Sequence, residues 1–417
     1  MAIFVIEGGN KLSGSLSAYG SKNAALPLLA ASLLTSDTLK LDNIPAILDV
    51  KKLISILKSL GVEVSRSDNA VTLTAGRVDP GALSNNLVGE LRGSILLMGA
   101  LLGRNKKMQL PRPGGDVIGA RPIDVHLDAF TQLGAHVDES EEAVIIDGER
   151  MKAGVVVMRE FSVTATENVL LTAAKLPGET TIHIAAAEPH VVALAELLNA
   201  MGANIEGAGT HTITVQGQTK LGGATYTNIP DMLEAGFFIL LGAVTQSELV
   251  IENVPVDHLR LFFKKLDDIN VSYTVDEEAG RVIVHPSKLR AFKMQSLPHP
   301  GIATDLQAPF AVMATQASGS SLIHDPMYED RFKHIAELKK MGARAVVCDP
   351  HRVVIEGPTK LAGKEISSLD IRSGATLVMA GLVAHGQTII HQAEIIERGY
   401  ADLTKRLQKA GAIIARK

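Results

Sequence analysis

The segment that decides the fold is Leu53-Ile-Ser-Ile-Leu-Lys-Ser-Leu-Gly-Val-Glu-Val64, because its pattern returns five more times along the 417 residues. Each copy predicts a helix with one apolar face, then a tight turn, then a short strand. The turn residues lie about 70 residues apart, a period that indicates structural repeats. Glycine, or asparagine in one copy, suits the left-handed conformation that ends a helix. The six turn residues are Gly61, Gly134, Gly202, Asn270, Gly342 and Gly411.

A second and more hydrophobic segment lies between these helices. It occurs at 24–34, 94–102, 169–176, 237–244, 308–315 and 375–383, and a short strand follows each copy. A helix that is apolar on every side is a buried helix. The sequence therefore predicts six α/β units, with buried helices at the centre and sheets outside, which fit two domains of three units each. The sequence leaves open which units pair, and a solenoid of six units is the alternative.

Composition excludes several classes of protein. Hydrophobic residues make up 46% and charged residues 21%, the net charge is -4, aromatics are 4% and Trp is absent. These values suit a globular protein and disfavour binding to nucleic acid or to anionic membranes. The single cysteine, Cys348, excludes an intrachain disulfide and is predicted to be a buried strand residue. The first residues predict a short strand and not a signal peptide, so we expect a cytoplasmic protein without membrane insertion.

Polar residues gather where the buried helices are predicted to begin. Asn23 and Asp305 each precede by four residues a proline that fits the first helical turn. Ser21 and Thr304 alone are explained by ordinary N-capping. Capping does not explain cations at helix starts, where the dipole opposes them. Such cations predict a bound anion, and they are Lys22, Arg92 and Arg372, the last preceded by Asp370.

Two further segments carry charged residues on predicted loops. The stretch Leu110-Pro-Arg-Pro-Gly-Gly-Asp-Val-Ile-Gly-Ala-Arg-Pro122 has three glycines and three prolines and contains Arg112, Asp116 and Arg121. This composition predicts a hinged surface loop, with an ordinary crossover as the alternative. Glu397-Arg-Gly-Tyr400 places Arg398 after the sixth strand, and Tyr328-Glu-Asp-Arg331 occupies the matching place in the fifth unit.

Together these motifs resemble the UDP-N-acetylglucosamine 1-carboxyvinyltransferase family of enolpyruvyl transferases. The resemblance extends from Val5 to Ala415, and the Gly-Gly-x-x-Ile-Gly-Ala-Arg-Pro loop is its most specific part. It implies an α/β fold of two inside-out α/β barrel domains, with three repeats in each and substrates in the cleft between them. The expected domains are 1–20 with 230–417, and 21–229. The resemblance also implies transfer of the enolpyruvyl group of phosphoenolpyruvate to the 3′-hydroxyl of UDP-N-acetylglucosamine, the first committed step of peptidoglycan synthesis, which serves cell shape and division.

The resemblance also implies roles for individual residues. Lys22, Arg121 and Arg398 hold the phosphate of phosphoenolpyruvate, and Arg331 and Arg372 surround its carboxylate. Asp305 deprotonates the sugar hydroxyl, and Asn23 helps to place that hydroxyl and the tetrahedral intermediate. The expected catalytic residues are Asp116, Asp305, Asn23, Lys22 and Arg398. The expected substrate-binding residues are Lys22, Asn23, Arg92, Arg121, Pro122, Ile123, Asp124, Val125, Ser162, Val163, Asp305, Met327, Arg331, Asp370, Arg372 and Arg398. No metal, no other cofactor and no obligate protein partner is expected.

Two positions depart from the family pattern. Asp116 stands where most members have the loop cysteine, which is thought to protonate C3 of the substrate. A free aspartic acid has a pKa near ~3.9, so only about one in a thousand is protonated at pH 7. The hypothesis is that Asp116 becomes an acid only in the closed, loaded site, and without a thiol we expect insensitivity to fosfomycin. Leu48 replaces a lysine that many relatives have near the phosphate site.

Two other functions remain as alternatives. One is an enolpyruvyl transferase with another acceptor, such as shikimate 3-phosphate or another nucleotide. The other is a catalytically inactive nucleotide-sugar-binding protein, against which the presence of Asp305, Arg121 and Arg398 argues.

Overall fold

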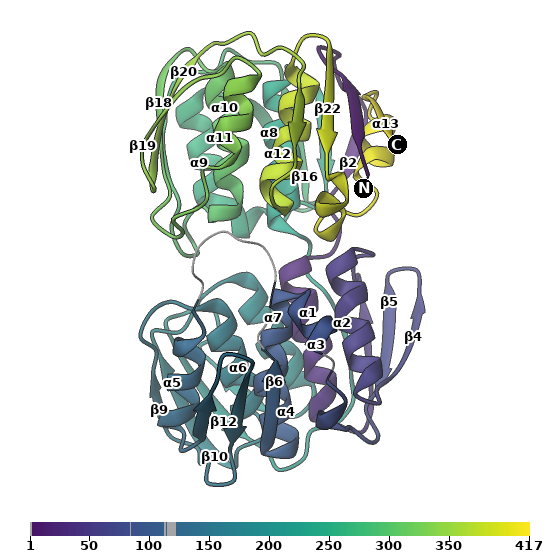
Figure 1. The fold of residues 1–417 in the computed structure, drawn as a ribbon, viewed down its shortest axis with the longest axis vertical. Coiled ribbons are helices and arrows are strands. Elements are labelled where there is room, and N and C mark those ends of the chain that lie inside the picture. The colour runs from purple at the N-terminus through teal and green to yellow at the C-terminus, as the bar shows by residue number, and fades with distance from the viewer. Residues whose placement is uncertain (1, 84, 112–113, 115–121) are drawn as a thin grey trace. The chain divides into compact units, whose positions relative to one another are not determined.

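The computed structural model describes residues 2–83, 85–111, 114 and 122–417, with the side chain of residue 85 left out. These residues form two units (Figure 1). The C unit contains the described residues 2–19 and 230–417, and the N unit contains the described residues 20–229. The predicted residues Arg112, Asp116 and Arg121 lie outside the described residues.

Helices alternate with strands throughout both units. The helices of the N unit are α1 (Lys22–Ala31), α2 (Leu48–Ser59), α3 (Asn85–Gly89), α4 (Leu97–Asn105), α5 (Asp124–Gln132), α6 (Val163–Ala173) and α7 (Pro189–Ala200), with 3-10 helices η1 (Ser32–Leu34), η2 (Pro80–Ala82) and η3 (Arg92–Leu96). Those of the C unit are α8 (Met232–Val244), α9 (Arg260–Ile269), α10 (Gln307–Gln316), α11 (His334–Lys340), α12 (Ile371–Val383) and α13 (Leu403–Lys409), with η4 (Val256–Leu259), η5 (Thr304–Leu306) and η6 (Ala393–Arg398).

The strands of the N unit form three sheets. Their orders are β13 (Ala224–Thr227), β3 (Thr38–Asp42), β5 (Ala70–Thr74), β4 (Glu63–Ser67); β11 (Asn204–Glu206), β12 (Thr212–Gly217), β10 (Gly178–His183), β9 (Val155–Val157); and β6 (Lys107–Pro111), β8 (Ala143–Asp147), β7 (His136–Glu139). The C unit also has three sheets. Their orders are β21 (Glu365–Ser367), β22 (Gln387–His391), β1 (Phe4–Glu7), β23 (Ile413–Arg416); β15 (Ser272–Asp276), β16 (Arg281–His285), β14 (Leu249–Glu252), β2 (Ser15–Ser17); and β17 (Lys293–Gln295), β18 (Gly319–His324), β20 (Arg352–Gly357), β19 (Arg344–Asp349).

One topology recurs in the five four-stranded sheets. An edge strand pairs in parallel with its neighbour, and the next two pairings are antiparallel. The sheet that contains β21 and β22 is completed by β1, which lies beside β22 although it comes from the other end of the chain (Figure 1). The N-terminal strands therefore belong with the C-terminal half of the chain.

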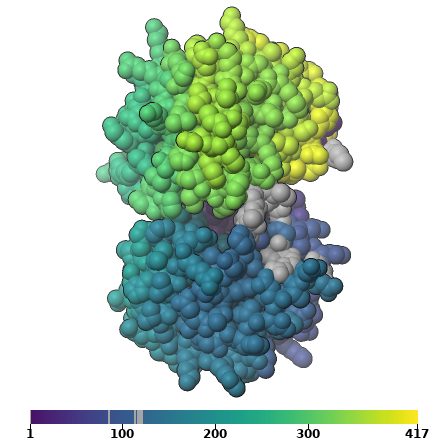
Figure 2. All heavy atoms as spheres, turned by 60° about the vertical axis from the view of Figure 1, so that its left-hand side comes forward, coloured from purple at the N-terminus to yellow at the C-terminus, as the bar shows by residue number. Residues whose placement is uncertain are grey.

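The most apolar helices lie at the centre of each unit, as predicted. In the C unit α10 packs against α8 and α12, and in the N unit α4 packs against α1 and α6. Nearly every residue of α8, α10 and α12 is buried. Figure 2 shows the atoms that form one outer face of each unit. Phe237, Phe238 and Phe310 are fully buried, and each large apolar side chain contributes about 1.5–3 kcal/mol relative to exposure.

The six turn residues predicted from the repeats all adopt the left-handed conformation. Their φ values are 96° at Gly61, 98° at Gly134, 106° at Gly202, 66° at Asn270, 102° at Gly342 and 91° at Gly411. The repeat pattern was thus a sound guide to where the outer helices end.

Two local predictions are wrong. Pro27 is the sixth residue of α1 and not a first-turn residue, because Ser21 accepts a hydrogen bond from the Ala24 N–H and starts the helix earlier. Pro309 does lie in the first turn of α10. Cys348 is on a strand but exposed, because β19 is an edge strand whose register shifts between Val347 and Asp349.

Candidate active site

The buried helices of the C unit begin with acidic residues. The Asp231 carboxylate accepts hydrogen bonds from two backbone N–H groups of the first turn of α8, at 2.8 and 3.1 Å. The Asp370 carboxylate accepts from the N–H groups of Arg372 and Ser373 at 2.9 and 3.0 Å. Both residues are therefore N-caps, which satisfy the free donors of a helix start.

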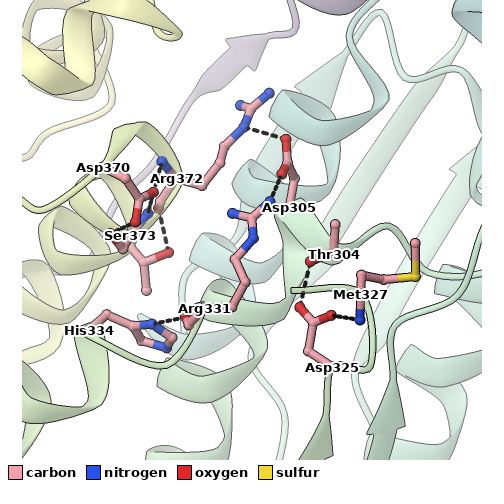
Figure 3. Close-up of polar contacts among 10 residues, drawn as sticks. Thr304, Asp305, Asp325, Met327, Arg331, His334, Asp370, Arg372 and Ser373 are labelled. Atoms are coloured by element: carbon pink, nitrogen blue, oxygen red, sulfur yellow. Dashed lines mark hydrogen bonds and ion pairs between the residues drawn. The ribbon is translucent and has the colours of Figure 1, made fainter. Parts of the chain in front are cut away.

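Asp305 lies on η5, which leads into α10, and it joins two of these helix starts. Its Oδ1 accepts a hydrogen bond from Arg331 Nη2 at 2.6 Å, and its Oδ2 accepts one from Arg372 Nε at 3.0 Å (Figure 3). The side chains of Arg331 and Arg372 are 9% and 5% exposed, whereas that of Asp305 is 21% exposed. Asp305 thus joins two buried guanidinium groups through one partly exposed carboxylate.

The guanidinium of Arg372 has two nitrogens without a well-formed hydrogen bond to the described residues, although it also interacts with the Tyr400 side chain. Its Nη1 and Nη2 atoms are buried without a hydrogen-bond partner among the described residues, and so is Nε of Arg331. The Arg372 guanidinium lies over the Tyr400 ring at 5.2 Å, and that of Arg331 lies over the Tyr328 ring at 5.3 Å. Burial alone lowers the pKa of Arg372, but Tyr400, Asp305 and Asp231 raise it above its ordinary value. Buried donors without partners are costly unless a ligand completes them, and a guanidinium fork suits a carboxylate or phosphate.

Arg398 is the last residue of η6 and not a loop residue as predicted. The following residue, Gly399, packs against the start of α12, since a Cβ added there would lie 2.4 Å from Ile371 Cγ2. Glycine is therefore needed for this close approach. The contact brings Arg398, which is half-buried, to the same end of the C unit as Arg372.

Thr304 does not cap a helix, contrary to expectation. Its hydroxyl donates to Asp325 Oδ2 at 2.5 Å, and Asp325 Oδ1 accepts from the Met327 N–H at 3.0 Å. Asp325 is fully buried, and burial raises its pKa, opposed by these two hydrogen bonds and by Arg331. The N-cap of η5 is Ala303, which explains why the Thr304 hydroxyl is available to Asp325.

In the N unit, Lys22 and Asn23 are the first two residues of α1. Lys22 Nζ lies 3.1 Å from Oδ2 of Asp49, a buried residue on α2 next to Leu48. The cation at this helix start thus has a protein carboxylate beside it, which the sequence did not reveal. Leu48 is partly exposed at the beginning of α2.

Arg92 begins η3, and its positive charge acts on the buried His126. Burial and then Arg92 lower the pKa of His126 to about 3, so its ring is neutral at pH 7. The ring nitrogens of His126 contact Thr164 Oγ1 at 3.2 Å and Asn168 Nδ2 at 3.0 Å. These contacts connect α5 to the first turns of α6, and Asn168 Nδ2 also donates to the Ile95 carbonyl of η3 at 3.1 Å.

The other predicted sugar-nucleotide residues of the N unit lie at the starts of α5 and α6, whereas Met327 lies on the loop between β18 and α11 of the C unit. Ser162 is the N-cap of α6 but makes no side-chain capping bond, and Val163 is the first residue of that helix. Pro122 precedes α5, Ile123 is its N-cap, and Asp124 and Val125 are its first residues. Sequence reasoning missed four residues, none of which belongs to a quoted motif: Asp49, His126, Asp231 and Asp325.

Among the described residues no helix is long and apolar enough to cross a membrane. Within the same part of the chain, no three His, Cys, Asp or Glu side chains are grouped so that they could hold a metal ion.

Solved structures of enolpyruvyl transferases share this fold. The enolpyruvyl transferase NikO from Streptomyces tendae superposes with a TM-score of 0.90 at 27% identity, over 100% of this chain and 99% of that one. EPSP synthase from Acinetobacter baumannii gives a TM-score of 0.72 at 21% identity, over 100% of both chains, and shows the fold alone. The predicted two-domain α/β fold of the enolpyruvyl transferase type is confirmed.

Sequence comparison identifies the family. Residues 6–407 match the model of EPSP synthase (3-phosphoshikimate 1-carboxyvinyltransferase). UDP-N-acetylglucosamine 1-carboxyvinyltransferase 2 of Carboxydothermus hydrogenoformans is 39% identical, over 100% of this chain and 99% of the relative. The enzyme of the same name from Listeria monocytogenes is 40% identical, over 99% of this chain and 97% of the relative. The chain belongs to the EPSP synthase family of enolpyruvyl transferases, among relatives named UDP-N-acetylglucosamine 1-carboxyvinyltransferase.

Proposed function

We propose that this chain transfers the enolpyruvyl group of phosphoenolpyruvate to the 3′-hydroxyl of UDP-N-acetylglucosamine and releases phosphate, in the cytoplasm, as the first committed step of peptidoglycan synthesis. The full-length similarity to relatives of that name supports the choice of acceptor.

The observation that carries the proposal is the group formed by Asp305, Arg331 and Arg372. Arg372 binds Asp305 through Nε and keeps Nη1 and Nη2 for an anion. Phosphoenolpyruvate has a carboxylate that can accept two parallel hydrogen bonds from such a fork. The same cluster therefore combines a carboxylate able to take a proton with donors able to bind the carboxylate of the second substrate.

The proposed reaction is an addition followed by an elimination. As Asp305 removes the proton of the sugar hydroxyl, the oxygen attacks C2 of the enolpyruvyl group and C3 gains a proton. The product of this step is a tetrahedral ketal that still carries the phosphate. Loss of a proton from C3 then restores the double bond while the C2–O bond to phosphate breaks. These steps balance without a metal or a redox cofactor.

Other residues bind the substrates or supply a proton in this proposal. Lys22, Arg121 and Arg398 hold the phosphate and stabilise it as it leaves, which is electrostatic stabilisation of developing charge. Asn23 places the sugar hydroxyl, and Asp116 supplies the proton to C3. The sugar nucleotide contacts Arg92, residues 121–125, Ser162, Val163 and Met327, and Asp370 supports the site as the N-cap of α12.

A phosphate-release assay tests the proposal. The purified chain receives phosphoenolpyruvate together with either UDP-N-acetylglucosamine or shikimate 3-phosphate, and phosphate is followed against time. Release that depends on the UDP-sugar, with a product whose mass has increased by one enolpyruvyl group, is the expected result. Release only with shikimate 3-phosphate identifies a different acceptor. Calorimetric binding of the UDP-sugar without turnover identifies an inactive sugar-nucleotide-binding protein.

A further inference from the structure

The strand registers identify one equivalent position in five of the repeats. In each of these sheets the edge strand and its neighbour pair in parallel, and the equivalent position is the residue directly after the last paired residue of that neighbour. The last pairs, with the neighbour strand named first, are Asp42 with Thr227, His183 with Val157, Glu252 with Ser17, His324 with Gln295, and His391 with Ser367. The equivalent residues are Asn43, Ile184, Asn253, Asp325 and Gln392. The backbone conformation and burial of each of these residues can therefore be compared with those of the other four.

Asp325 is the exception among these five residues. The other four adopt the left-handed conformation, with φ of 55° at Asn43, 59° at Ile184, 57° at Asn253 and 55° at Gln392, whereas Asp325 does not. Those four are half-buried or exposed, whereas Asp325 is fully buried. The fifth repeat, which carries Asp305, therefore lacks a local geometry that the other four of these repeats have. Departures from a consistent local pattern are expected at functional sites.

The contacts of Asp325 explain what replaces that geometry. In two other repeats the equivalent asparagine bonds toward the parallel partner strand or the residues just after it, as Asn253 Nδ2 does to Ser17 Oγ and Asn43 Nδ2 to the Asn228 carbonyl. Asp325 instead turns its carboxylate inward, to the hydroxyl of Thr304 and the N–H of Met327 (Figure 3). Its own carbonyl accepts a hydrogen bond from His351 Nδ1 at 2.8 Å.

These bonds connect two segments of the candidate site. Thr304 is adjacent to Asp305 on η5, and Met327 belongs to the loop that leads to Arg331. A buried carboxylate costs stability, and burial raises its pKa, so a stability role alone is better served by an uncharged residue. The carboxylate therefore fixes the distance between the turn of Asp305 and the loop of Met327 and Arg331.

We propose that Asp325 is a positioning residue, which holds Asp305 in line with the sugar hydroxyl through Thr304 and shapes the sugar-nucleotide loop through the Met327 N–H. This inference rests on the proposed function. Asp325 itself touches no substrate, so its removal acts on Asp305 and Met327.

Thr304→Val tests the link to Asp305, because valine keeps the shape of threonine and removes only the hydroxyl. We expect kcat to fall by about tenfold to a hundredfold, as for the loss of one hydrogen bond to a charged group, with KM for phosphoenolpyruvate within about threefold. Thr315→Val is the matched control, since Thr315 is a buried threonine of α10, the helix that follows η5, and its hydroxyl donates to the Val312 carbonyl at 2.7 Å. Its kcat is expected to stay near that of the wild type.

Asp325→Asn and Asp325→Ala test the carboxylate. Asparagine can still accept from the Met327 N–H and donate to the Thr304 hydroxyl, so its kcat is expected to exceed that of the alanine variant by about tenfold. Equal kcat in Thr304→Val, Thr315→Val and the wild type overturns the inference while leaving the proposed function intact. If the wild type itself shows no turnover, the crystal structure of Thr304→Val decides. An Asp305 carboxylate that has left Arg331 or Arg372 supports the inference, and an unmoved one overturns it.

Discussion

Arg372→Lys is the substitution that most sharply separates ligand binding from structure. Lysine keeps the positive charge but has one ammonium group in place of a planar fork. In the structure Arg372 donates a hydrogen bond from Nε to Asp305, and its Nη1 and Nη2 atoms have no hydrogen-bond partner among the described residues. A lysine cannot serve both partners with the same geometry, so at least one charge-assisted hydrogen bond is lost. Such a bond contributes about 1.5–3 kcal/mol, which corresponds to about a tenfold to hundredfold weaker binding of phosphoenolpyruvate.

The assay is steady-state phosphate release combined with calorimetry of phosphoenolpyruvate binding, since KM equals Kd only when chemistry is slow. Arg104→Lys is the matched control. Arg104 has its Nη1 and Nη2 atoms bonded to the backbone carbonyls of Leu33, Thr35, Ala75 and Gly76, at 2.8–3.1 Å. Its replacement is expected to lower Tm without changing KM. An unchanged affinity for phosphoenolpyruvate in Arg372→Lys would refute the assignment of the two unpartnered nitrogens.

Three further predictions concern the base, the loop and the response to acid. Asp305→Asn is expected to lower kcat by about 10²- to 10⁴-fold, the usual contribution of a general base, with KM for the UDP-sugar little changed; near-normal turnover would exclude Asp305 as the base. Asp116→Asn is expected to lose turnover, because asparagine cannot donate the proton to C3. The wild type is expected to resist fosfomycin because residue 116 is not a thiol, and time-dependent inactivation at micromolar drug would contradict this. Burial lowers the pKa of His334 to about 4, so the folded state keeps it neutral while the unfolded state binds a proton below about pH 6.5. The stability present above pH 6.5 is therefore lost as the pH falls toward 4, by about 3 kcal/mol in all. Urea unfolding between pH 7 and 4 should show a shallower pH dependence for His334→Gln, and an equal dependence in both proteins rules this explanation out.

The repeat was predictable because it depends on local chemistry. Apolar periodicity marks each helix, and a residue that tolerates positive φ marks its end, so all six turns from Gly61 to Gly411 lie where expected. The completion of the last sheet was not predictable in this way. The pairing of Phe4 with Ile390 joins segments far apart in sequence, and neither strand carries a local signal for its partner.

The candidate site shows the same division between local and long-range information. Arg372 was found because it is a cation at a helix start, and Asp305 because it stands four residues before a proline and in a family motif. Their ion pair spans 67 residues and required the fold. Asp325 was missed because it stands out only when its backbone conformation is compared with that of the equivalent residues. Asn43 and Asn253 occupy the same position in their repeats but have a left-handed conformation, which Asp325 lacks. Cys348 was predicted to be buried because the sequence pattern of a strand does not reveal the register shift that exposes this residue.

A crystal structure with both phosphoenolpyruvate and UDP-N-acetylglucosamine tests the central claim most directly. We predict the ligand carboxylate within hydrogen-bonding distance of Arg372 Nη1 and Nη2, and the sugar O3 within the same distance of Asp305. Ligands bound elsewhere, with both nitrogens of Arg372 still unpartnered, would contradict the account.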